Sequence, residues 1–404
     1  MANVSSSNGL EKHPKLRFPC FDQPYTVSPL SNYLFENTER NRDLLFDKED
    51  VLSVSGEFGV VNQIEFQGRS FAGESVAEYH VVNTNDVVYT KSPLKANPYG
   101  IIKTNKGVPG IVSTLYAVYH PKECVDPLYV EYYFGNDLRL NKFLKPLVNI
   151  GAKHDMKVNN EFVLTGEVCF PSVIEQQKVV EFLSCLDRRI EKQRTLVEHL
   201  KKYKRGLLSS LLDKEEWQTV LMQDVACGFD YGMNSAATEY DGKHKYIRIT
   251  DIDESSHKYI STECVSPSDI PEAKYKVEEN DILFARTGAS VGKSYIYDSR
   301  DGDLYYAGFL IRASVKPDFN SYFVYLNTLT LGYQRWVVLE STRSGQPGIN
   351  AEQYRNYKFK CPPIEIQNKI ANIFIHFDLK LQREQEILDY LLNYKKAMMQ
   401  NMFV

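Results

Sequence analysis

The sequence has few cysteines, and they form no pattern. Its seven cysteines are scattered along 404 residues without a C-x-x-C pair, and its eight histidines form no H-E-x-x-H spacing. The sequence therefore indicates neither a disulfide framework nor a zinc site, and no metal ligands are expected in this chain. This pattern is typical of a protein that works in a reducing cytoplasm.

Long apolar runs and an N-terminal export signal are also missing. No segment approaches the roughly 18 uninterrupted apolar residues of a membrane span, and residues 1–18 contain no apolar core of a signal peptide. We therefore expect no association with a membrane. Hydrophobic residues make up 43% of the chain and aromatic residues 12%, so two or three globular domains can each bury a core.

The sequence contains no motif that predicts catalysis. The segment most similar to an amino-methyltransferase signature is residues 97–100 (N-P-Y-G). It lacks the second proline of the signature and suits an ordinary turn. No P-loop, G-x-S-x-G motif or dinucleotide-binding fingerprint occurs. No catalytic residue is therefore assigned, and a stand-alone nuclease or methyltransferase is disfavoured.

One long stretch is present twice. Residues 170–212 and residues 361–403 align without a gap at a constant offset of 191. The positions that are identical in the two copies are Pro171/Pro362, Gln176/Gln367, Lys178/Lys369, Asp187/Asp378, Leu200/Leu391, Tyr203/Tyr394 and Lys204/Lys395. An internal repeat of this kind sets the architecture of the whole chain.

Each copy has the spacing of a long amphipathic helix. Apolar residues recur at alternating steps of three and four, which is typical of a seam along which two helices pack, and the expected partner is the other copy. Polar residues interrupt both seams at matching places and are expected to fix one antiparallel register. The register residues are Leu186, Ile190, Gln193, Val197, Leu200 and Lys204 in the first copy, and Phe377, Leu381, Glu384, Leu388, Leu391 and Lys395 in the second.

A stretch typical of a globular domain precedes each helix, and the two stretches have similar sequences. VNTNDVVYTKS at 82–92 parallels VEENDILFART at 277–287. The sequence therefore predicts an α+β fold in which two tandem mixed α/β domains are separated by two long helices packed as an antiparallel coiled coil, with a pseudo-two-fold internal repeat. The predicted parts are a flexible N-terminus at 1–17, a first domain at 18–169, a first helix at 170–214, a second domain at 215–360 and a second helix at 361–404.

Polar loops in the globular parts carry side chains of the types that contact nucleic acids. Arginine and lysine can make two hydrogen bonds to guanine, and asparagine and glutamine to adenine. The candidates in the second domain are Tyr246, Arg248, Thr250, Arg286, Thr287, Ser290, Lys293, Arg343, Ser344, Gln346 and Asn350, and those in the first domain are Lys91, Ser92, Lys95, Asn97, Lys103, Lys153 and His154. The alternative is that these residues only end strands and that the nearby glycines only permit tight turns.

The chain resembles the specificity subunits of type I restriction–modification systems. The resemblance is carried by P-S-V-I-E-Q-Q-K-V and Y-K-R-G-L-L-S-S-L-L in the first helix, P-P-I-E-I-Q-N-K-I and Y-K-K-A-M-M in the second, and NDILFARTGASVGKS with SGQPGIN in the second domain. It implies that each globular part is a target recognition domain for one half of a bipartite, asymmetric DNA sequence. The helices would act as a spacer and as the docking site of methyltransferase subunits. Ile366 departs from the pattern, because the family has Glu there, as at Glu175.

The resemblance also implies partners. Two methyltransferase subunits and two restriction and translocation subunits would assemble with this chain on double-stranded DNA, in the cytoplasm of a bacterium or archaeon. S-adenosylmethionine, ATP and magnesium would be bound by those partners, and this non-catalytic chain would hold no cofactor. The alternative is a non-catalytic coiled-coil scaffold without DNA binding, which would need the helices but not the polar loops.

Overall fold

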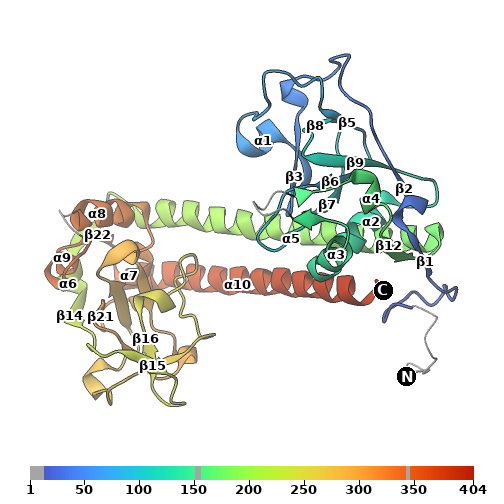
Figure 1. Ribbon diagram of the computed structural model, residues 1–404. Helices are drawn as coiled ribbons and strands as arrows, with labels where there is room; N and C mark the ends of the chain where they lie inside the picture. Colours follow the sequence, from blue (N-terminus) through green and yellow to red (C-terminus); the bar gives the residue numbers. More distant parts are fainter. Residues whose placement is uncertain (1–12, 151–155, 343–345) are drawn as a thin grey trace. The chain divides into compact units, whose positions relative to one another are not determined.

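The computed structural model of the protein describes residues 13–150, 156–342 and 346–404. The chain divides into two compact units, one of residues 1–193 and 387–404 and the other of residues 194–386. Each unit therefore combines one globular domain with about half of each long helix (Figure 1). The compact units cut across the consecutive parts expected from the sequence, because the helix halves pack against residues that are far away along the chain.

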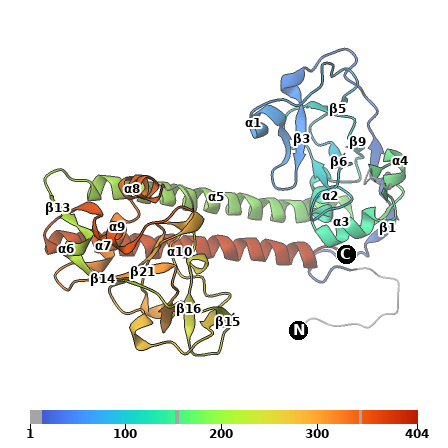
Figure 2. The same cartoon turned by 60° about the vertical axis from the view of Figure 1, so that its left-hand side comes forward.

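The two predicted long helices are confirmed. They are α5 (Val173–Leu212) and α10 (Ile364–Asn401). Within each unit their halves run antiparallel and lie side by side in both views (Figures 1 and 2). Pro171 and Pro362 lie just before the first helical turn, so neither proline interrupts the hydrogen bonds of its helix.

In each unit the paired helix halves continue the core of the globular domain. In the first unit, Val179 and Leu183 of α5 share a core with Met399 of α10. In the second unit, Leu208 of α5 shares a core with Phe374 of α10. The apolar seam read from the sequence is therefore buried by two neighbours, the other helix and the domain.

The predicted register residues lie on this seam. Leu186, Ile190, Gln193, Val197 and Leu388 are buried, and Leu200, Phe377, Leu381, Glu384 and Leu391 are half-buried. The two lysines of the set form ion pairs with the opposite helix within their own units. Lys204 Nζ lies 2.6 Å from Asp378 Oδ1, and Lys395 Nζ lies 2.5 Å from Asp187 Oδ1.

Both ion pairs fit a single antiparallel register. Lys204 lies as many residues after Asp187 along α5 as Asp378 lies before Lys395 along α10. Polar pairs in an otherwise apolar seam penalise any slip of one helix against the other, because a slip leaves the charges unpaired. The partners of the two predicted lysines are thus the repeated aspartates, and the role of these lysines in setting register stays a prediction.

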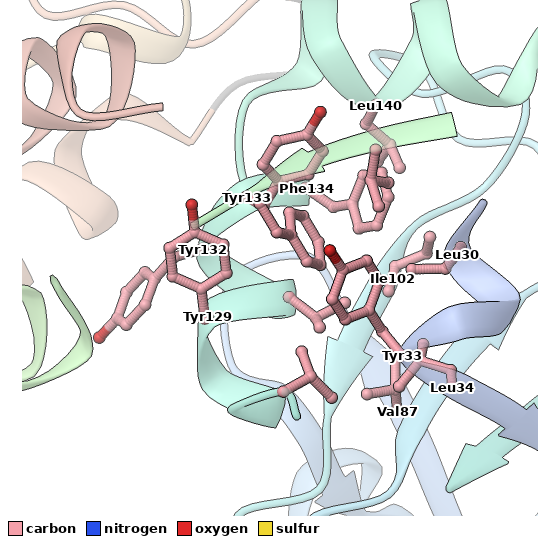
Figure 3. Close-up of a cluster of buried hydrophobic side chains, with 14 of the residues drawn as sticks. Leu30, Tyr33, Leu34, Val87, Ile102, Tyr129, Tyr132, Tyr133, Phe134 and Leu140 are labelled. Carbon is pink, nitrogen blue, oxygen red and sulfur yellow. The ribbon is translucent and has the colours of Figure 1, made fainter. Parts of the chain in front are cut away.

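The first globular domain is built on a four-stranded antiparallel sheet, with strand order β2-β9-β6-β7. The bounds of these strands are β2 Leu34–Glu36, β9 Tyr116–Pro121, β6 Val87–Thr90 and β7 Ile102–Thr104. Helix α2 (Pro127–Phe134) packs on the sheet and contributes Tyr129, Tyr133 and Phe134 to the core (Figure 3). Helix α3 (Asp137–Leu144) follows after a break at Gly135.

Smaller elements complete the first domain. They are the pairs β1 (Thr26–Pro29) with β12 (Glu167–Phe170), β3 (Leu52–Ser55) with β4 (Gly59–Asn62), β5 (His80–Val82) with β8 (Gly110–Val112) and β10 (Asn149–Ile150) with β11 (Met156–Lys157), and the helices α1 (Gln63–Gln67) and α4 (Asn160–Val163). The pair β1 and β12 leads directly into α5, so it connects the domain to its long helix.

The second globular domain repeats this plan. Its four-stranded sheet has the order β14-β21-β18-β19, formed by β14 Ala226–Tyr231, β21 Leu310–Val315, β18 Asp281–Ala285 and β19 Ser294–Ile296. The helices that follow it are α7 (Ser321–Asn327) and α8 (Leu331–Ser341). The remaining elements are β13 (Gln218–Leu221) with β22 (Lys358–Cys361), β15 (Ala237–Glu239) with β17 (Val265–Pro267), β16 (Lys245–Ile247) with β20 (Leu304–Tyr306), α6 (Met222–Val225) and α9 (Ala351–Arg355).

The sequence parallel between residues 82–92 and 277–287 corresponds to equivalent strands. In both domains a left-handed asparagine, Asn85 or Asn280, makes the turn before the strand, with φ of 75° and 71°. The aspartate that follows accepts a hydrogen bond from a backbone N–H three residues earlier, in Asn83 or Glu278. Asparagine tolerates the left-handed backbone region, and the aspartate closes the turn. The shared Asn-Asp dipeptide therefore specifies the same local structure in both domains. The predicted repeat of mixed domains is confirmed.

Part of the N-terminal segment that the sequence predicts to be flexible is anchored. Arg17 Nε and Nη2 each donate a hydrogen bond of 2.8 Å to Glu175, whose side chain is almost fully buried at the start of α5. Tyr25 donates a further bond of 3.1 Å to the same carboxylate. Ile366 replaces this glutamate in the second copy and is 37% exposed, so the departure from the family pattern removes an anchoring point at the second helix.

The buried side chain of His80 is expected to make the stability of the first domain depend on pH. Its side chain is buried, its Nδ1 has no hydrogen-bond partner among the described residues, and burial with the nearby charges of Arg40 and Lys91 lowers its pKa to about 4. In the unfolded chain a histidine has a pKa of about 6.5, so the unfolded state binds the proton more readily. We expect the free energy of unfolding to fall by up to about 3 kcal/mol as pH decreases from about 6.5 to about 4.

Urea unfolding at a series of pH values measures this dependence. The variant His80→Phe should show a smaller loss of stability over that pH range, whereas His199→Gln, at an exposed position of α5, should keep the full loss. An unchanged pH dependence in His80→Phe would show that other groups carry the acid sensitivity.

Candidate nucleic-acid interface

Two of the polar loops flagged in the sequence meet in the second domain. Gly288 N donates a hydrogen bond of 3.1 Å to Pro347 O, and Ile349 N donates one of 2.9 Å to Arg286 O. Thr287 and Gly348 also pair as an isolated β-bridge. Loop 285–294 and segment 346–350 therefore form one surface, although nothing in the sequence pattern requires them to be neighbours.

The glycines of loop 285–294 have structural roles. Gly288 and Gly292 have φ of 74° and 83°, in the left-handed region. A Cβ on Gly292 would lie 2.5 Å from Cγ1 of Val337, so a side chain there would also collide with α8. For these two positions the alternative explanation of a tight turn is correct.

Arg286 lines a pocket at the end of β18. The pocket has a volume of about 540 Å³ and its lining includes Tyr231, Arg248, Thr250 and Phe309. Arg286 Cζ lies 4.7 Å from the centroid of the Tyr231 ring, in a cation–π contact. We call this group of five residues the second-domain pocket.

Arg286 is a half-buried cation without a counter-charge in the described part of the chain. No carboxylate among the described residues forms an ion pair with it. It lies over the ring of Tyr231, whose hydroxyl accepts a hydrogen bond of 3.2 Å from Ala351 N. A guanidinium held in this way can donate two parallel hydrogen bonds to an acceptor pair such as the edge of a guanine or a phosphate.

Arg248 and Thr250 also line this pocket. Strand β16 ends at Ile247, and residues 249–251 form a turn of 3₁₀ helix. Arg248 Nε and Nη2 donate bonds of 2.8 and 2.7 Å to Asp251, and this carboxylate raises the pKa of the guanidinium. Arg248 is therefore a positioned but neutralised cation, and Thr250 is exposed beside it.

Three other candidates of the second domain hold the domain together. Tyr246 is buried and donates its hydroxyl hydrogen bond to Met233 O at 2.7 Å. Lys293 is largely buried, donates to Ile252 O at 3.1 Å and forms an ion pair with Glu254. Asn350 caps helix α9 by accepting a bond of 2.9 Å from Gln353 N. These three side chains make contacts within the domain, and their assignment as nucleic-acid contacts stays a prediction.

The remaining second-domain candidates lie on the rim of the loop surface or outside the described residues. Thr287 and Ser290 are half-buried and Gln346 is exposed. Arg343 and Ser344 lie outside the described residues. The accessible polar surface near Arg286 is thus formed by the rim of loop 285–294 and by Gln346.

The first domain has a lysine at the position of Arg286. Lys91 follows β6 as Arg286 follows β18, but its Nζ donates a bond of 3.2 Å to Asn160 Oδ1, and burial lowers its pKa. Lys103 is also half-buried with a pKa that burial lowers. Asn97 is buried and donates a hydrogen bond of 3.0 Å to Asp137 Oδ1.

Of the other first-domain candidates, two lie in the described part of the chain and two do not. Ser92 is half-buried and Lys95 is exposed, whereas Lys153 and His154 lie outside the described residues. Among the described candidates of this domain, Lys91 and Asn97 are bonded to neighbouring side chains of the domain.

Two aromatic residues of the second-domain pocket escaped the sequence analysis. Tyr231 ends β14, and Phe309, which is 59% exposed, lies between β20 and β21. The only signal in the sequence is an aromatic residue after a glycine at 308–309, inside otherwise strand-like text. Both residues become part of the pocket through long-range strand pairing, which local patterns do not report.

In the segments 13–150, 156–342 and 346–404, no group of three or more His, Cys, Asp or Glu residues is placed to hold a metal ion. None of the helices in the described part of the chain is long and apolar enough to cross a membrane.

Known proteins match this chain in family, sequence and fold. Residues 214–393 match the family model of the type I restriction modification DNA specificity domain. The type I restriction enzyme MjaX specificity subunit of Methanocaldococcus jannaschii is 25% identical over 198 residues, which are 47% of this chain and 46% of that protein. The alignment thus spans about half the length of this curated relative.

Two solved structures share the fold. The S subunit of a type I restriction–modification system from M. genitalium has a TM-score of 0.60 at 13% identity, covering 97% of this chain and 99% of that chain. A chain from a structure on complex assembly and conformational transition of the type I system has a TM-score of 0.54 at 14% identity, covering 95% and 99%. In the match over residues 214–393 and in its fold, the chain is similar to restriction–modification specificity proteins. Its predicted resemblance to the specificity subunits of type I systems is confirmed.

Proposed function

We propose that this chain is the DNA sequence-specificity subunit of a type I restriction–modification complex. Each globular domain reads one half of a bipartite, asymmetric target in double-stranded DNA. The paired helices act as the spacer between the two halves and as the docking site of the methyltransferase subunits. The chain is non-catalytic in this proposal and acts in the cytoplasm.

The observation that supports this proposal best is a repeated scaffold with different side chains at equivalent places. The sheets have the same order, and the long helices use the same aspartate–lysine pairs. Yet Lys91 is bonded to Asn160 where Arg286 is stacked on Tyr231. The two domains share one scaffold but place different side chains at equivalent positions. They would therefore select different half-sites, because base discrimination depends on the side chains that reach the groove.

Partner subunits supply the chemistry in this proposal. Two methyltransferase subunits bind S-adenosylmethionine, and two restriction and translocation subunits use ATP and magnesium. The sum of charges in the chain is −4, so phosphate contacts made by partners are needed for strong binding. The chain contributes the choice of sequence.

The proposal is tested with the chain co-purified with its methyltransferase subunit. The complex should methylate adenines within a single bipartite motif of a mixed genomic DNA, and sequencing that detects methylated adenine identifies that motif. The methyltransferase subunit alone, on the same DNA, is the control. Methylation without any common motif, or a complex that binds no DNA, would support the scaffold alternative instead.

A further inference from the structure

Two aspartates at equivalent positions of the long helices each contact a lysine and a tyrosine. In the first unit Asp187 pairs with Lys395 at 2.5 Å and accepts a hydrogen bond of 2.8 Å from the Tyr132 hydroxyl. In the second unit Asp378 pairs with Lys204 at 2.6 Å and accepts a hydrogen bond of 2.5 Å from the Tyr322 hydroxyl.

Each aspartate therefore connects three parts of the protein. The aspartate belongs to one long helix and the lysine to the other, and the tyrosine belongs to the globular domain. Tyr132 lies in α2 and Tyr322 in α7, the helices that pack on the sheets. The contact that sets helix register is thus also a contact that fixes the domain on the helices.

A repeated glutamine provides a second attachment of the same domain helices. Gln176 Oε1 accepts a hydrogen bond of 3.0 Å from Asp126 N, and Gln367 Oε1 accepts one of 3.0 Å from Asn320 N. Asp126 and Asn320 are the N-caps of α2 and α7, and both glutamines are buried. Two attachment points on each domain helix limit its rotation about a single contact.

The tyrosines come from non-equivalent positions of their helices. Relative to the N-caps Asp126 and Asn320, Tyr132 lies one helical turn further along its helix than Tyr322. The residue of α7 that corresponds to Tyr132 is Leu326. Duplication alone would give tyrosines at the same position, so their convergence on equivalent carboxylates indicates a requirement for this contact.

The surroundings favour a persistent hydrogen bond. Burial, followed by the charge of the aspartate, raises the pKa of Tyr322, and Asp187 acts in the same direction on Tyr132, so both hydroxyls stay protonated donors at neutral pH. The side chains of Lys204 and Asp378 are only 18% and 20% exposed, so water competes poorly for the ion pair.

We propose that Asp187 and Asp378 are positioning residues that couple helix register to the orientation of each DNA-reading domain, and so determine how strictly the complex selects the spacer between half-sites. This inference rests on the proposed function. The tyrosine holds the DNA-reading domain at one angle to the helices. Without the tyrosine contact, the DNA-reading domain can rotate enough to accept a target whose half-sites are one base pair closer together or further apart.

The test uses the full chain in complex with its methyltransferase subunit. Methylation rates are compared on targets with the preferred spacer and with spacers one base pair shorter or longer. Tyr322→Phe should lower the ratio of preferred to altered spacer by about tenfold, the factor of one hydrogen bond to a charged group, while the bases of both half-sites stay the same. Tyr132→Phe should do the same through the first domain.

Tyr325→Phe is the matched control, because it removes a hydroxyl from the same helix and its ring lies 5.7 Å from that of Tyr322. It should keep the wild-type ratio. A wild-type ratio in Tyr322→Phe, or an equal fall in Tyr325→Phe, overturns the inference. A wild-type complex that shows no sequence selectivity overturns the proposed function instead.

A second variant keeps the test decisive if Tyr322→Phe does not fold. Lys204→Gln breaks the ion pair with Asp378 and leaves Tyr322 in place. It should also lower the spacer ratio, because the carboxylate loses the contact that fixes it in the seam. An unchanged ratio in folded Lys204→Gln counts against the coupling.

Discussion

Replacing Arg286 with alanine is expected to reduce methylation of the native target by roughly 5- to 150-fold, the range that corresponds to losing one bidentate contact. The guanidinium is stacked on Tyr231 and has no carboxylate partner among the described residues, so it is free to donate two hydrogen bonds to DNA. The loss should be confined to the half-site read by the second domain. Methylation rates on targets with single-base changes in either half-site measure both effects.

Two further variants distinguish base recognition from charge. Arg286→Lys keeps the charge but loses the planar fork and the stacking, so it should restore little of the selectivity. Arg300→Ala removes an exposed arginine of the same domain that is paired with Asp298, and it should leave selectivity unchanged. If Arg286→Lys is as selective as wild type and only the salt dependence changes in Arg286→Ala, the residue contacts phosphate and not a base.

Deleting one heptad from both long helices is expected to change the spacer length of the target and not its bases. Residues 193–199 of α5 and 383–389 of α10 are opposite each other in the register set by the two ion pairs. Removing both shortens each helix by about 10 Å and should shorten the preferred spacer by about three base pairs. Mapping the methylated motif of the shortened protein measures the new spacer.

Deleting the heptad from one helix only is the control. In that variant Asp187 and Lys395 can pair, or Lys204 and Asp378 can pair, but not both in one register. We expect methylation of every spacer length to fall by about a hundredfold, since misplaced readers cannot engage both halves together. New bases in a half-site of the paired deletion would show that the helices take part in reading and not only in spacing.

Much of the candidate site could not be predicted from residue type. Lys293 and Arg286 are basic residues of one loop, yet Lys293 is bonded inside the domain and Arg286 faces a pocket. Asn350 has a side chain suited to adenine, but it caps helix α9. Residue type specifies which hydrogen bonds a side chain can make, whereas the fold decides whether a neighbour in the protein already makes them.

The sequence by itself determined the elements that depend on local and periodic information. The spacing of apolar residues gave α5 and α10, and the repeat gave two domains of one topology. The shared Asn-Asp dipeptide specifies equivalent turns before β6 and β18. These features follow from interactions between residues that are close in the chain or repeated at a fixed period.

Only the tertiary structure decided which distant side chains share a contact. It placed Tyr231 and Phe309 around Arg286, and it gave the repeated aspartates Asp187 and Asp378 their lysine and tyrosine partners. Each of these contacts joins residues from separate strands or helices. Their positions depend on how the elements pack, and packing is a property of the whole folded chain that no local spacing records.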